Sequence, residues 1–321
     1  MQTPSCWVIT GGSAGMENQC LGLAEAMGIE PVVKRVKLRS PWRQLSPFLR
    51  IGNRFAAGPH GDPIQPPWPD LVISCGRQSI APSLAVRKLS RRRTFTVHIQ
   101  DPQIRPRHFD LVVVPRHDRL RGANVLVTRG SLHRVTSAML AAAAAEHGPN
   151  LESLPHPRVA VLVGGSNAVY RLTPTIMGDV AEKLADLTRT RGAGLMVTPS
   201  RRTGTDNEAI LRARLSGPTA KVWDGTGANP YFAYLAMADV IVCTCDSVNM
   251  VSEACSTGKP VYVIELEGGS PKFRAFLDGL YRDGIARPFT GELESWTYPP
   301  LDETRQIADE VRRRMQARRG R

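Results

Sequence analysis

Short runs rich in valine and isoleucine alternate with longer, helix-like stretches along the 321-residue chain. In the first half, "CWVIT" (6–10) precedes "NQCLGLAEAMG" (18–28), and "DLVISC" (70–75) precedes "IAPSLAVRKLS" (80–90). The runs "FTVHI" and "DLVVV" follow them. Continuous apolar strands that alternate with helices are typical of a parallel sheet whose two faces are both covered. The pattern therefore predicts an α/β fold.

A proline-rich break, "HGPNLESLPHP" (147–157), interrupts this alternation, which then starts again. The second series of apolar runs is "RVAVLVGG", "GLMVTPS", "DVIVCTC" and "PVYVIEL". Because 321 residues exceed the usual size of one core, we predict two doubly wound parallel-sheet (Rossmann-like) domains, residues 1–150 and 151–321. The final stretch, from residue 303, is expected to form a helix that packs back toward the first domain, followed by a basic tail.

Positive charge is concentrated in the first half of the chain. Residues 1–150 hold 20 Lys and Arg against 9 Asp and Glu, a net charge of +11, whereas residues 151–321 have a net charge of +2. A field of this sign attracts anionic partners, such as an anionic membrane surface or a phosphorylated substrate. Nucleic acid is not an expected partner, because no nucleic-acid-binding module is recognisable. The alternative is an arginine-rich, solvated surface that has no partner.

The sequence offers neither a secretory signal nor a membrane span. The first residues lack the basic start of a signal peptide, and no run approaches the ~20 apolar residues that cross a bilayer. We therefore expect a cytoplasmic protein that binds peripherally at the inner face of a membrane. The six cysteines lie in or beside apolar runs without a CxxC pair, so we expect buried thiols and no metal site.

The stretch "CTCDSVNMVSEACSTGKPVYV" joins an apolar run to a helix-like run. If the helix starts at Asp246 or Ser247, its first N–H groups and the positive end of its dipole suit a phosphate. Asn249 and Glu253 share a helix face, and Glu253 lies about 9 Å along the helix from Ser247. That spacing matches the reach from a diphosphate to the ribose of one nucleotide. The alternative is that Asp246 only caps the helix and Glu253 is solvated.

Two loops that follow neighbouring strands of the second domain add further candidates. In "VLVGGSNAVYRLT", Gly164 and Gly165 would let the backbone approach a ligand closely, and Ser166 adds a hydroxyl group. In "TPSRRTG", Arg201 and Arg202 offer guanidinium groups, which are suited to phosphate. Each loop alone is also typical of an ordinary surface turn.

The first domain has loops of the same kind in "TGGSAGMENQCLGLAEA" and "SCGRQSIAPS". Neither is a GxGxxG loop, and no acidic residue ends the following strand, so a dinucleotide-dependent dehydrogenase is disfavoured. A general base would have to come from Asp101 or Glu17, because His98 fits a packed strand position better. The substrate-binding candidates in these loops are Gly12, Ser13, Gly15, Gln19, Gly76 and Arg77.

Many of these stretches occur together, and in the same order, in one known family. They include "GGSAGMENQCLGLAEAMG", "PDLVISCGRQSIAPSLAVRKL", "DPQIRPRHFDLVVVPRHD", "VGGSNAVYRLT", "TPSRRTG" and "NPYFAYLAMADVIVCTCDSVNMVSEACSTGKPVYVIEL". Through them, nearly the whole chain resembles the mitochondrial fission family named for the elongated-mitochondria (ELM) phenotype, in particular its prokaryotic members.

That family in turn looks like GT-B glycosyltransferases, especially the lipid-linked N-acetylglucosaminyl transferase of peptidoglycan synthesis. The resemblance implies that the 164–166 loop and the helix start from Ser247 to Met250 hold a nucleotide diphosphate, and that Glu253 holds the ribose. The transferase carries a histidine just after the glycines of its first loop, whereas "GGSAGMENQ" has none. The identity of the base therefore stays open, with Asp101 as our candidate.

Together these features favour a GT-B-like glycosyltransferase that binds a nucleotide sugar in its second domain. It would transfer the sugar to a lipid-linked or envelope acceptor at the cytosolic face of a membrane. The nucleotide sugar is a substrate, and we expect no separate cofactor and no metal. One alternative is a non-catalytic fission-type adaptor that recruits a partner protein to a membrane. Another is a nucleotide-sugar epimerase, which would be expected to place more acidic residues and histidines in its site.

Overall fold

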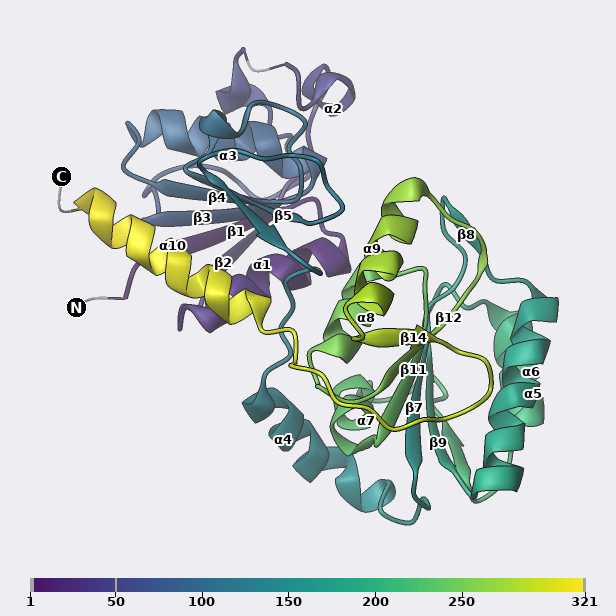
Figure 1. Ribbon diagram of the computed structural model, residues 1–321. Helices are drawn as coiled ribbons and strands as arrows, with labels where there is room; N and C mark the ends of the chain where they lie inside the picture. The colour runs from purple at the N-terminus through teal and green to yellow at the C-terminus, as the bar shows by residue number, and fades with distance from the viewer. Residues whose placement is uncertain (1–2, 50, 320–321) are drawn as a thin grey trace. The chain divides into compact units, whose positions relative to one another are not determined.

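The computed structural model describes residues 3–49 and 51–319. Two compact units divide the chain: unit 1 comprises the chain up to Arg134 together with the chain from Asp302 onward, and unit 2 comprises Val135–Leu301. Each unit has its own six-stranded sheet, and all pairs of neighbouring strands within these two sheets are parallel (Figure 1). The predicted fold class, two doubly wound α/β domains, is confirmed.

The sheet of unit 1 has the strand order β2-β1-β3-β4-β5-β6. Its inner strands β1, β3 and β4 are buried along their whole length because they carry almost only apolar residues and lie between two layers of helices. The order reverses between β1 and β3, as in other doubly wound sheets. The six strands are β1 (Cys6–Thr10), β2 (Val32–Arg35), β3 (Leu71–Cys75), β4 (Phe95–Ile99), β5 (Leu111–Pro115) and β6 (Val125–Thr128).

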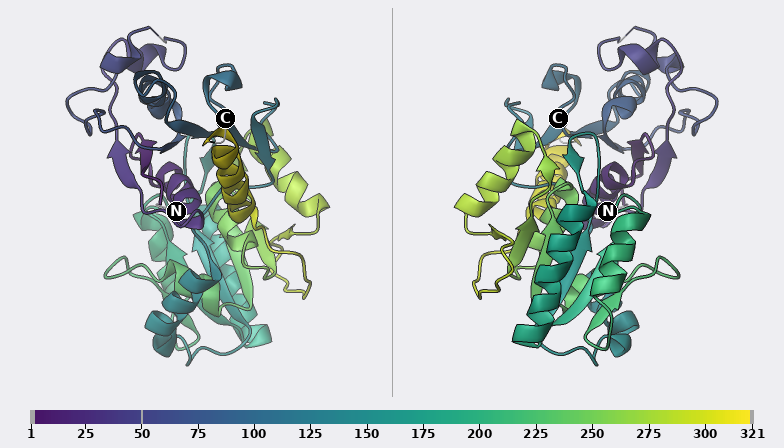
Figure 2. Two further views of the ribbon diagram at one scale, coloured as in Figure 1. Left: turned by 90° about the vertical axis from the view of Figure 1, so that its left-hand side faces the viewer. Right: turned by 90° about the vertical axis from the view of Figure 1, so that its right-hand side faces the viewer.

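The C-terminal helix α10 (Glu303–Arg319) belongs to unit 1, where it packs along α1 (Ala14–Ala26), as Figures 1 and 2 show. It places Ile307, Ala308, Val311 and Met315 in the same apolar cluster as Cys20 and Leu23 of α1. The predicted return of this helix to the first domain is confirmed. The expected basic tail is helical up to Arg319, and its last two residues lie outside the described part. The remaining helices of unit 1 are α2 (Trp42–Leu45), η1 (Asn53–Phe55), α3 (Arg77–Leu89) and η2 (Pro106–His108).

The sheet of unit 2 has the strand order β10-β9-β7-β11-β12-β14. Numbered along the unit, this is the order 3-2-1-4-5-6 of the nucleotide-binding Rossmann fold. The chain reverses its direction of progress across the sheet between β7 and β11, which are paired neighbours. The strands are β7 (Arg158–Val163), β9 (Gly194–Pro199), β10 (Ala220–Val222), β11 (Val240–Thr244), β12 (Val261–Ile264) and β14 (Ala286–Pro288), and a small hairpin pairs β8 (Tyr170–Arg171) with β13 (Glu267–Gly268).

Helices cover both faces of the sheet of unit 2, with α5 and α6 on one face and α7 and α8 on the other (Figures 1 and 2). Hydroxyl side chains cap the N-termini of several helices. At α5, Thr173 Oγ1 accepts a hydrogen bond from Ile176 N, and at α9, Ser270 Oγ accepts one from Phe273 N. The helices are α4 (Ser137–His147), η3 (Gly148–Asn150), α5 (Pro174–Arg191), α6 (Thr205–Arg214), α7 (Tyr231–Met237), α8 (Val248–Cys255) and α9 (Pro271–Arg282).

The division between the units differs from the boundary expected at residues 150/151. Helix α4 lies before that boundary, yet it packs against α7 and so belongs to unit 2. The proline-rich stretch 147–157 is not a linker, because Leu151 and Leu154 are buried in the core of unit 2. Counted over these units, unit 1 carries 27 Lys and Arg against 12 Asp and Glu, and unit 2 carries 15 against 17. The excess of positive charge therefore lies wholly in unit 1.

All six cysteines are free and buried, as expected from their apolar surroundings. Burial raises the pKa of the Cys6 thiol to about 12. Within the described residues, no helix is both long enough and apolar enough to cross a membrane.

Two glycines in helix interiors provide a test of the packing in each unit. A Cβ atom on Gly22 of α1 would lie 2.2 Å from the His133 carbonyl oxygen, whereas a Cβ on Gly178 of α5 would meet nothing within 4 Å. We expect Gly22→Ala to lower the free energy of unfolding by about 2 kcal/mol or more. Gly178→Ala should raise it by ~0.5–1 kcal/mol, because alanine is the better helix former. Denaturant titration measures both, and equal effects of the two changes would contradict the described packing at α1.

Candidate functional site

The loops that follow β7, β9 and β11 meet at the carboxyl ends of these strands in unit 2. Open parallel sheets bind ligands at this end, at the point where the strand order reverses. Most of the candidates from the second half of the sequence lie here, on the 164–167 loop, on the 200–204 loop and at the start of α8.

Asp246 connects these loops through a buried carboxylate. Thr244 Oγ1 donates a hydrogen bond to Asp246 Oδ1 (2.6 Å) and accepts one from the backbone N–H of Gly164 (2.8 Å). Arg202 Nη2 lies 2.7 Å from Asp246 Oδ2 in an ion pair, and Asn167 Nδ2 donates to the Asp246 carbonyl oxygen (3.1 Å). Asp246 and Arg202, both expected to bind substrate, thus bind each other. Asp246 is also not the N-cap of α8.

Gly164 and Gly165 are required by the packing of these loops against each other. A Cβ atom on Gly164 would lie 2.1 Å from Asp246 Oδ1, and one on Gly165 would lie 1.9 Å from the Arg202 carbonyl oxygen. The backbone of Gly165 has a φ of +156°. The close approach expected at these glycines is therefore made by protein atoms. Ser166 likewise serves the loop, since its Oγ accepts a hydrogen bond from Leu172 N (3.0 Å).

Helix α8 starts directly after Asp246, with Ser247 as its N-cap. Ser247 Oγ accepts a hydrogen bond from Met250 N (3.3 Å), and its backbone is extended. Asn249 lies in the first turn, and the side chain of Met250 packs against the core of unit 2. The helix therefore presents its N-terminal end at the carboxyl edge of the sheet, an arrangement that suits an anion. Arg201 is exposed on the neighbouring 200–204 loop and makes no ion pair with the described residues.

Glu253 lies two turns into α8 and is partly buried. Its Oε2 atom accepts a hydrogen bond of 2.6 Å from the Tyr231 hydroxyl on α7. Burial raises the pKa of Glu253 to about 7, and the hydrogen bond from Tyr231 opposes this rise only in part. A solvated Glu253, the alternative to a ligand-binding role, does not fit this environment.

In unit 1, the glycine loops form turns at the carboxyl ends of β1 and β3. Gly12 and Gly76 adopt left-handed backbone conformations, with φ values of +87° and +84°. Ser13 is the N-cap of α1 without a side-chain cap hydrogen bond. Gly15 and the buried Gln19 lie in the first two turns of that helix. The guanidinium of Arg77 is engaged with the preceding segment, because its Nη2 atom donates to the carbonyl oxygens of Arg43 and Gln44.

The three titratable candidates for a base differ sharply in their surroundings. Glu17 accepts two hydrogen bonds from the Arg35 guanidinium, at 2.6 and 2.9 Å, and these lower the pKa of its carboxyl, which makes it a weak base. His98 is buried against Phe109, and burial lowers its pKa to about 3, so it is a packed residue as the strand pattern favoured. Asp101 is exposed after β4, and its Oδ1 accepts a hydrogen bond from Gln103 N (2.8 Å).

Three residues of the site in unit 2 were not identified from the sequence: Thr244, Thr203 and Tyr231. Thr203 Oγ1 donates to the Gly164 carbonyl oxygen (2.6 Å), as does Ser200 Oγ (2.7 Å). A polar residue within an otherwise apolar strand was a usable signal for Thr244. Tyr231 lies 22 residues before Glu253, and no local pattern links the two. Among the described residues, no group of three or more His, Cys, Asp or Glu side chains could hold a metal ion.

A family model described as "Mitochondrial fission ELM1" matches residues 14–315. The chain belongs to the mitochondrial fission ELM1 family. This confirms the family resemblance found in the sequence.

Relatives of the chain include a plant protein and a bacterial protein. The mitochondrial fission protein ELM1 of Arabidopsis thaliana is 33% identical over 277 residues, which cover 78% of this chain and 65% of that protein. The chain therefore spans slightly less than two thirds of that relative's length. An uncharacterized protein of Rickettsia prowazekii is 25% identical over 286 residues, or 76% of this chain and 79% of its own length.

Solved structures with the same fold are GT-B epimerases and glycosyltransferases. A putative UDP-N-acetylglucosamine 2-epimerase of Listeria monocytogenes has a TM-score of 0.57 at 12% identity, covering 98% of this ELM1-family chain and 88% of its own. The Methanocaldococcus jannaschii UDP-GlcNAc 2-epimerase in complex with UDP-GlcNAc and UDP has a TM-score of 0.52 at 12% identity, covering 96% and 98%. Acinetobacter baumannii MurG has a TM-score of 0.50 at 12% identity, covering 98% and 93%. At such low identity these likenesses establish the fold alone.

The raised pKa of Glu253 predicts how stability changes with pH. A folded-state pKa of about 7 against 4.5 for the free side chain means that the folded protein holds the proton more tightly. The contribution of Glu253 to stability is therefore greatest when its carboxyl group is protonated, and this contribution falls by ~3 kcal/mol at most as the pH rises from about 4.5 through 7. Glu253→Gln has no carboxyl group to titrate at this position. The free energy of unfolding of the variant minus that of wild type should therefore increase by about 2–3 kcal/mol between pH 5 and pH 8.

Glu152 provides the matched control, because it is an exposed carboxylate of the same unit. Denaturant titrations of Glu152→Gln at the same pH values should run parallel to wild type. A difference between Glu253→Gln and wild type that does not change with pH would show that Glu253 is solvated.

Proposed function

We propose that this protein is a GT-B-type glycosyltransferase that binds a nucleotide sugar at the carboxyl edge of the sheet of unit 2. The sugar would pass to a lipid-linked or envelope acceptor at the cytosolic face of a membrane. The observation that carries the proposal is the position of the α8 N-terminus and of Glu253 beside the point where the strand order reverses, between β7 and β11. In a fold shared with nucleotide-sugar epimerases and glycosyltransferases, this is the position at which a nucleotide is expected.

The diphosphate of the donor would lie at the start of α8. The first N–H groups of the helix have no partners within the helix, and the helix dipole adds partial positive charge. Arg201 supplies a full positive charge from the neighbouring loop, since it is exposed and has no ion pair with the described residues. Arg202 contributes indirectly, because its pairing with Asp246 holds the 200–204 loop against α8. Together these groups would stabilise the negative charge that develops on the leaving diphosphate.

The ribose of the nucleotide would lie against Glu253. The Tyr231 hydroxyl occupies Oε2 and leaves Oε1 as an acceptor for a ribose hydroxyl. With a pKa of about 7, the empty protein holds Glu253 in both protonation states at neutral pH. A ribose hydroxyl that donates to the carboxylate favours the charged state, so nucleotide binding would release a proton there.

Transfer requires the acceptor hydroxyl to lose its proton as its oxygen bonds to the anomeric carbon and the bond to the diphosphate breaks. Asp101 is the best candidate for the base, because Glu17 is held by Arg35 and His98 is buried. The chain supplies the diphosphate contacts from backbone N–H groups and arginine. The reaction as proposed therefore needs no separate cofactor.

A specific observation also favours a second candidate, a non-catalytic adaptor. Two of the three titratable groups considered as bases in unit 1 are already engaged, and the family is described as acting in mitochondrial fission. Such an adaptor would keep the nucleotide site as a regulatory site and bind a partner protein.

An epimerase is the third candidate, because several solved structures with the same fold are epimerases. A screen of UDP-, GDP-, ADP- and CMP-sugars by thermal shift, with donor hydrolysis, sugar transfer and epimerisation assayed alongside, separates the three.

The proposed role of Glu253 is tested by nucleotide affinity. Glu253→Gln keeps the shape of the side chain but loses the charge, and a hydrogen bond to a charged group contributes about 1.5–3 kcal/mol. We therefore expect the affinity for the nucleoside diphosphate that binds to fall roughly ten- to a hundredfold. Isothermal titration at pH 8 measures this directly, with Glu152→Gln as the control that should match wild type. Unchanged affinity in Glu253→Gln would end the proposal for this residue.

A further inference from the structure

The segment between β2 and β3 exposes several large apolar side chains. Eight large apolar side chains are exposed in the described part of the chain, and four of them lie in this segment: Leu45, Phe48, Ile51 and Phe55. Phe48 is 68% exposed and Ile51 is 83% exposed. Exposed apolar side chains that are clustered in this way mark interaction surfaces more often than scattered ones do.

These side chains are exposed although the segment itself is anchored. Arg77 of α3 donates to the carbonyl oxygens of Arg43 (3.1 Å) and Gln44 (2.7 Å), and Ser46 Oγ donates to the Arg77 carbonyl oxygen (2.9 Å). Trp42 packs against a small buried cluster made of Leu38, Ala56 and Ala81. The segment is therefore held at its base against α3 while Phe48 and Ile51 remain in solvent.

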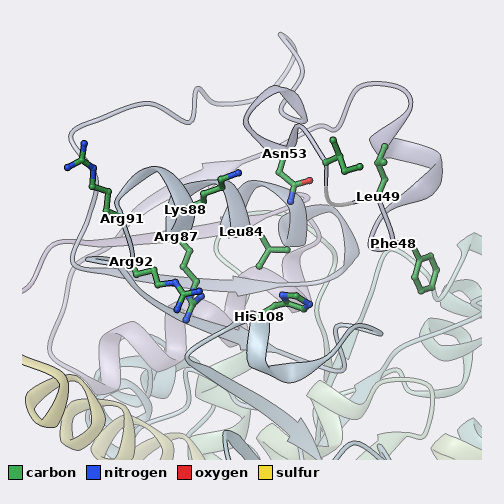
Figure 3. Close-up of a pocket in the computed structure, with 10 residues that line it drawn as sticks. Phe48, Leu49, Asn53, Leu84, Arg87, Lys88, Arg91, Arg92 and His108 are labelled. Carbon is green, nitrogen blue, oxygen red and sulfur yellow. The ribbon is translucent and has the colours of Figure 1, made fainter.

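A groove of about 830 Å³ separates this apolar segment from the end of α3. Phe48 and Leu49 stand on one side of the groove, and Arg91 and Arg92 stand on the other (Figure 3). Lys88 also lines the cationic side, and none of the described residues that line the groove is acidic. The groove thus combines an apolar edge with a cationic edge.

The cations at the end of α3 are available for a ligand. Arg87 is paired with Asp110, with Nη2 and Oδ1 2.9 Å apart. Lys88, Arg91 and Arg92, in contrast, are exposed and make no ion pair with any of the described residues. These three side chains place three unneutralised charges on one edge of the groove.

Two consecutive arginines directly after α3 adopt a backbone conformation that is unusual for residues with a side chain. Arg91 and Arg92 have φ values of 54° and 62°, in the left-handed region that favours glycine. Their N–H groups close the end of α3 by donating to the Lys88 and Arg87 carbonyl oxygens, at 3.0 and 2.8 Å. Glycine would make the same hydrogen bonds at lower cost, so the presence of arginine at both positions points to a use for the side chains. The helix dipole favours basic residues in the last turn of α3, but it does not call for arginines beyond the helix end.

We propose that the groove holds the phosphate headgroup of an anionic phospholipid, while Phe48 and Ile51 insert into the adjacent membrane interface. The groove would provide the membrane contact that the proposed function assumes. The proposal is argued from the residues of the groove alone, and it requires no bound nucleotide. Interfacial binding combines buried apolar area with attraction to anionic lipids, and both parts are present here. A nucleic acid would use the cations but would leave the aliphatic Leu45 and Ile51 without a role. The net positive charge of unit 1 would draw the same surface toward an anionic membrane.

The charged edge is tested with a variant that should not harm folding. Arg91→Gly together with Arg92→Gly removes two charges and places glycine where the backbone has a positive φ. Because glycine adopts this conformation without strain, the melting temperature should equal or exceed that of wild type. Binding to vesicles of phosphatidylcholine mixed with phosphatidylglycerol should weaken by about thirtyfold, which corresponds to ~1 kcal/mol for each charge near the surface. The matched control, Lys221→Gln with Arg282→Gln, removes two exposed charges from unit 2 and should weaken binding by about threefold or less.

The apolar edge is tested by Phe48→Ser with Ile51→Ser, which should weaken binding to the same vesicles by about tenfold or more. Wild type should bind vesicles of phosphatidylcholine alone far more weakly, and Glu253→Gln should bind the mixed vesicles as wild type does. The proposal would be overturned by equal binding to neutral and mixed vesicles, or by a glycine variant that binds like the unit 2 control. It would also be overturned if a single-stranded oligonucleotide bound the wild type but not the glycine variant, while the mixed vesicles bound neither protein.

Discussion

The buried carboxylate of Asp246 is the contact on which the arrangement of the site in unit 2 depends. It joins the ends of three strands, because Thr244 and Arg202 bind its two oxygens and Gly164 lies directly against it. A buried carboxylate without partners would be costly, so the arginine and the hydroxyl must remain in place for the loops to stay together. The position of the α8 N-terminus follows from this contact, since Ser247 begins the helix one residue later.

Sequence patterns predicted the inner part of each sheet well and the edges poorly. Strands such as β1, β3 and β11 are buried along their length, and their continuous apolar runs are visible in the sequence. The edge strands β6, β10 and β14 are short and partly exposed, so they carry no such run and were not predicted. The domain boundary was misplaced because proline and glycine indicate a break in regular structure but do not show whether that break is a linker. Here the segment belongs to unit 2, because Leu151 and Leu154 lie in its core.

The site was predictable in position but not in the roles of its residues. The loops at Gly164, Arg202 and Ser247 follow neighbouring strands, and the strand pattern alone brings them to one edge of the sheet. The sequence could not reveal that Asp246 and Arg202 neutralise each other, or that Tyr231 reaches Glu253 from another helix, because these are contacts between side chains distant in sequence. The residues predicted to bind phosphate thus form two groups. Some of them, such as Arg202, hold the loops in place, and others, such as Arg201, are exposed and can contact a ligand.

Helix α10 gives the two units different folding histories during synthesis. Unit 2 is one continuous stretch of chain and can complete its core as soon as Leu301 has left the ribosome. Unit 1 begins first but must wait, because Ile307, Ala308 and Val311 of α10 complete the cluster around Cys20 and Leu23. Until then, that face of α1 is exposed to solvent and to chaperones while a second domain is made. Unit 1, most of which precedes unit 2 in the chain, therefore completes its core after unit 2.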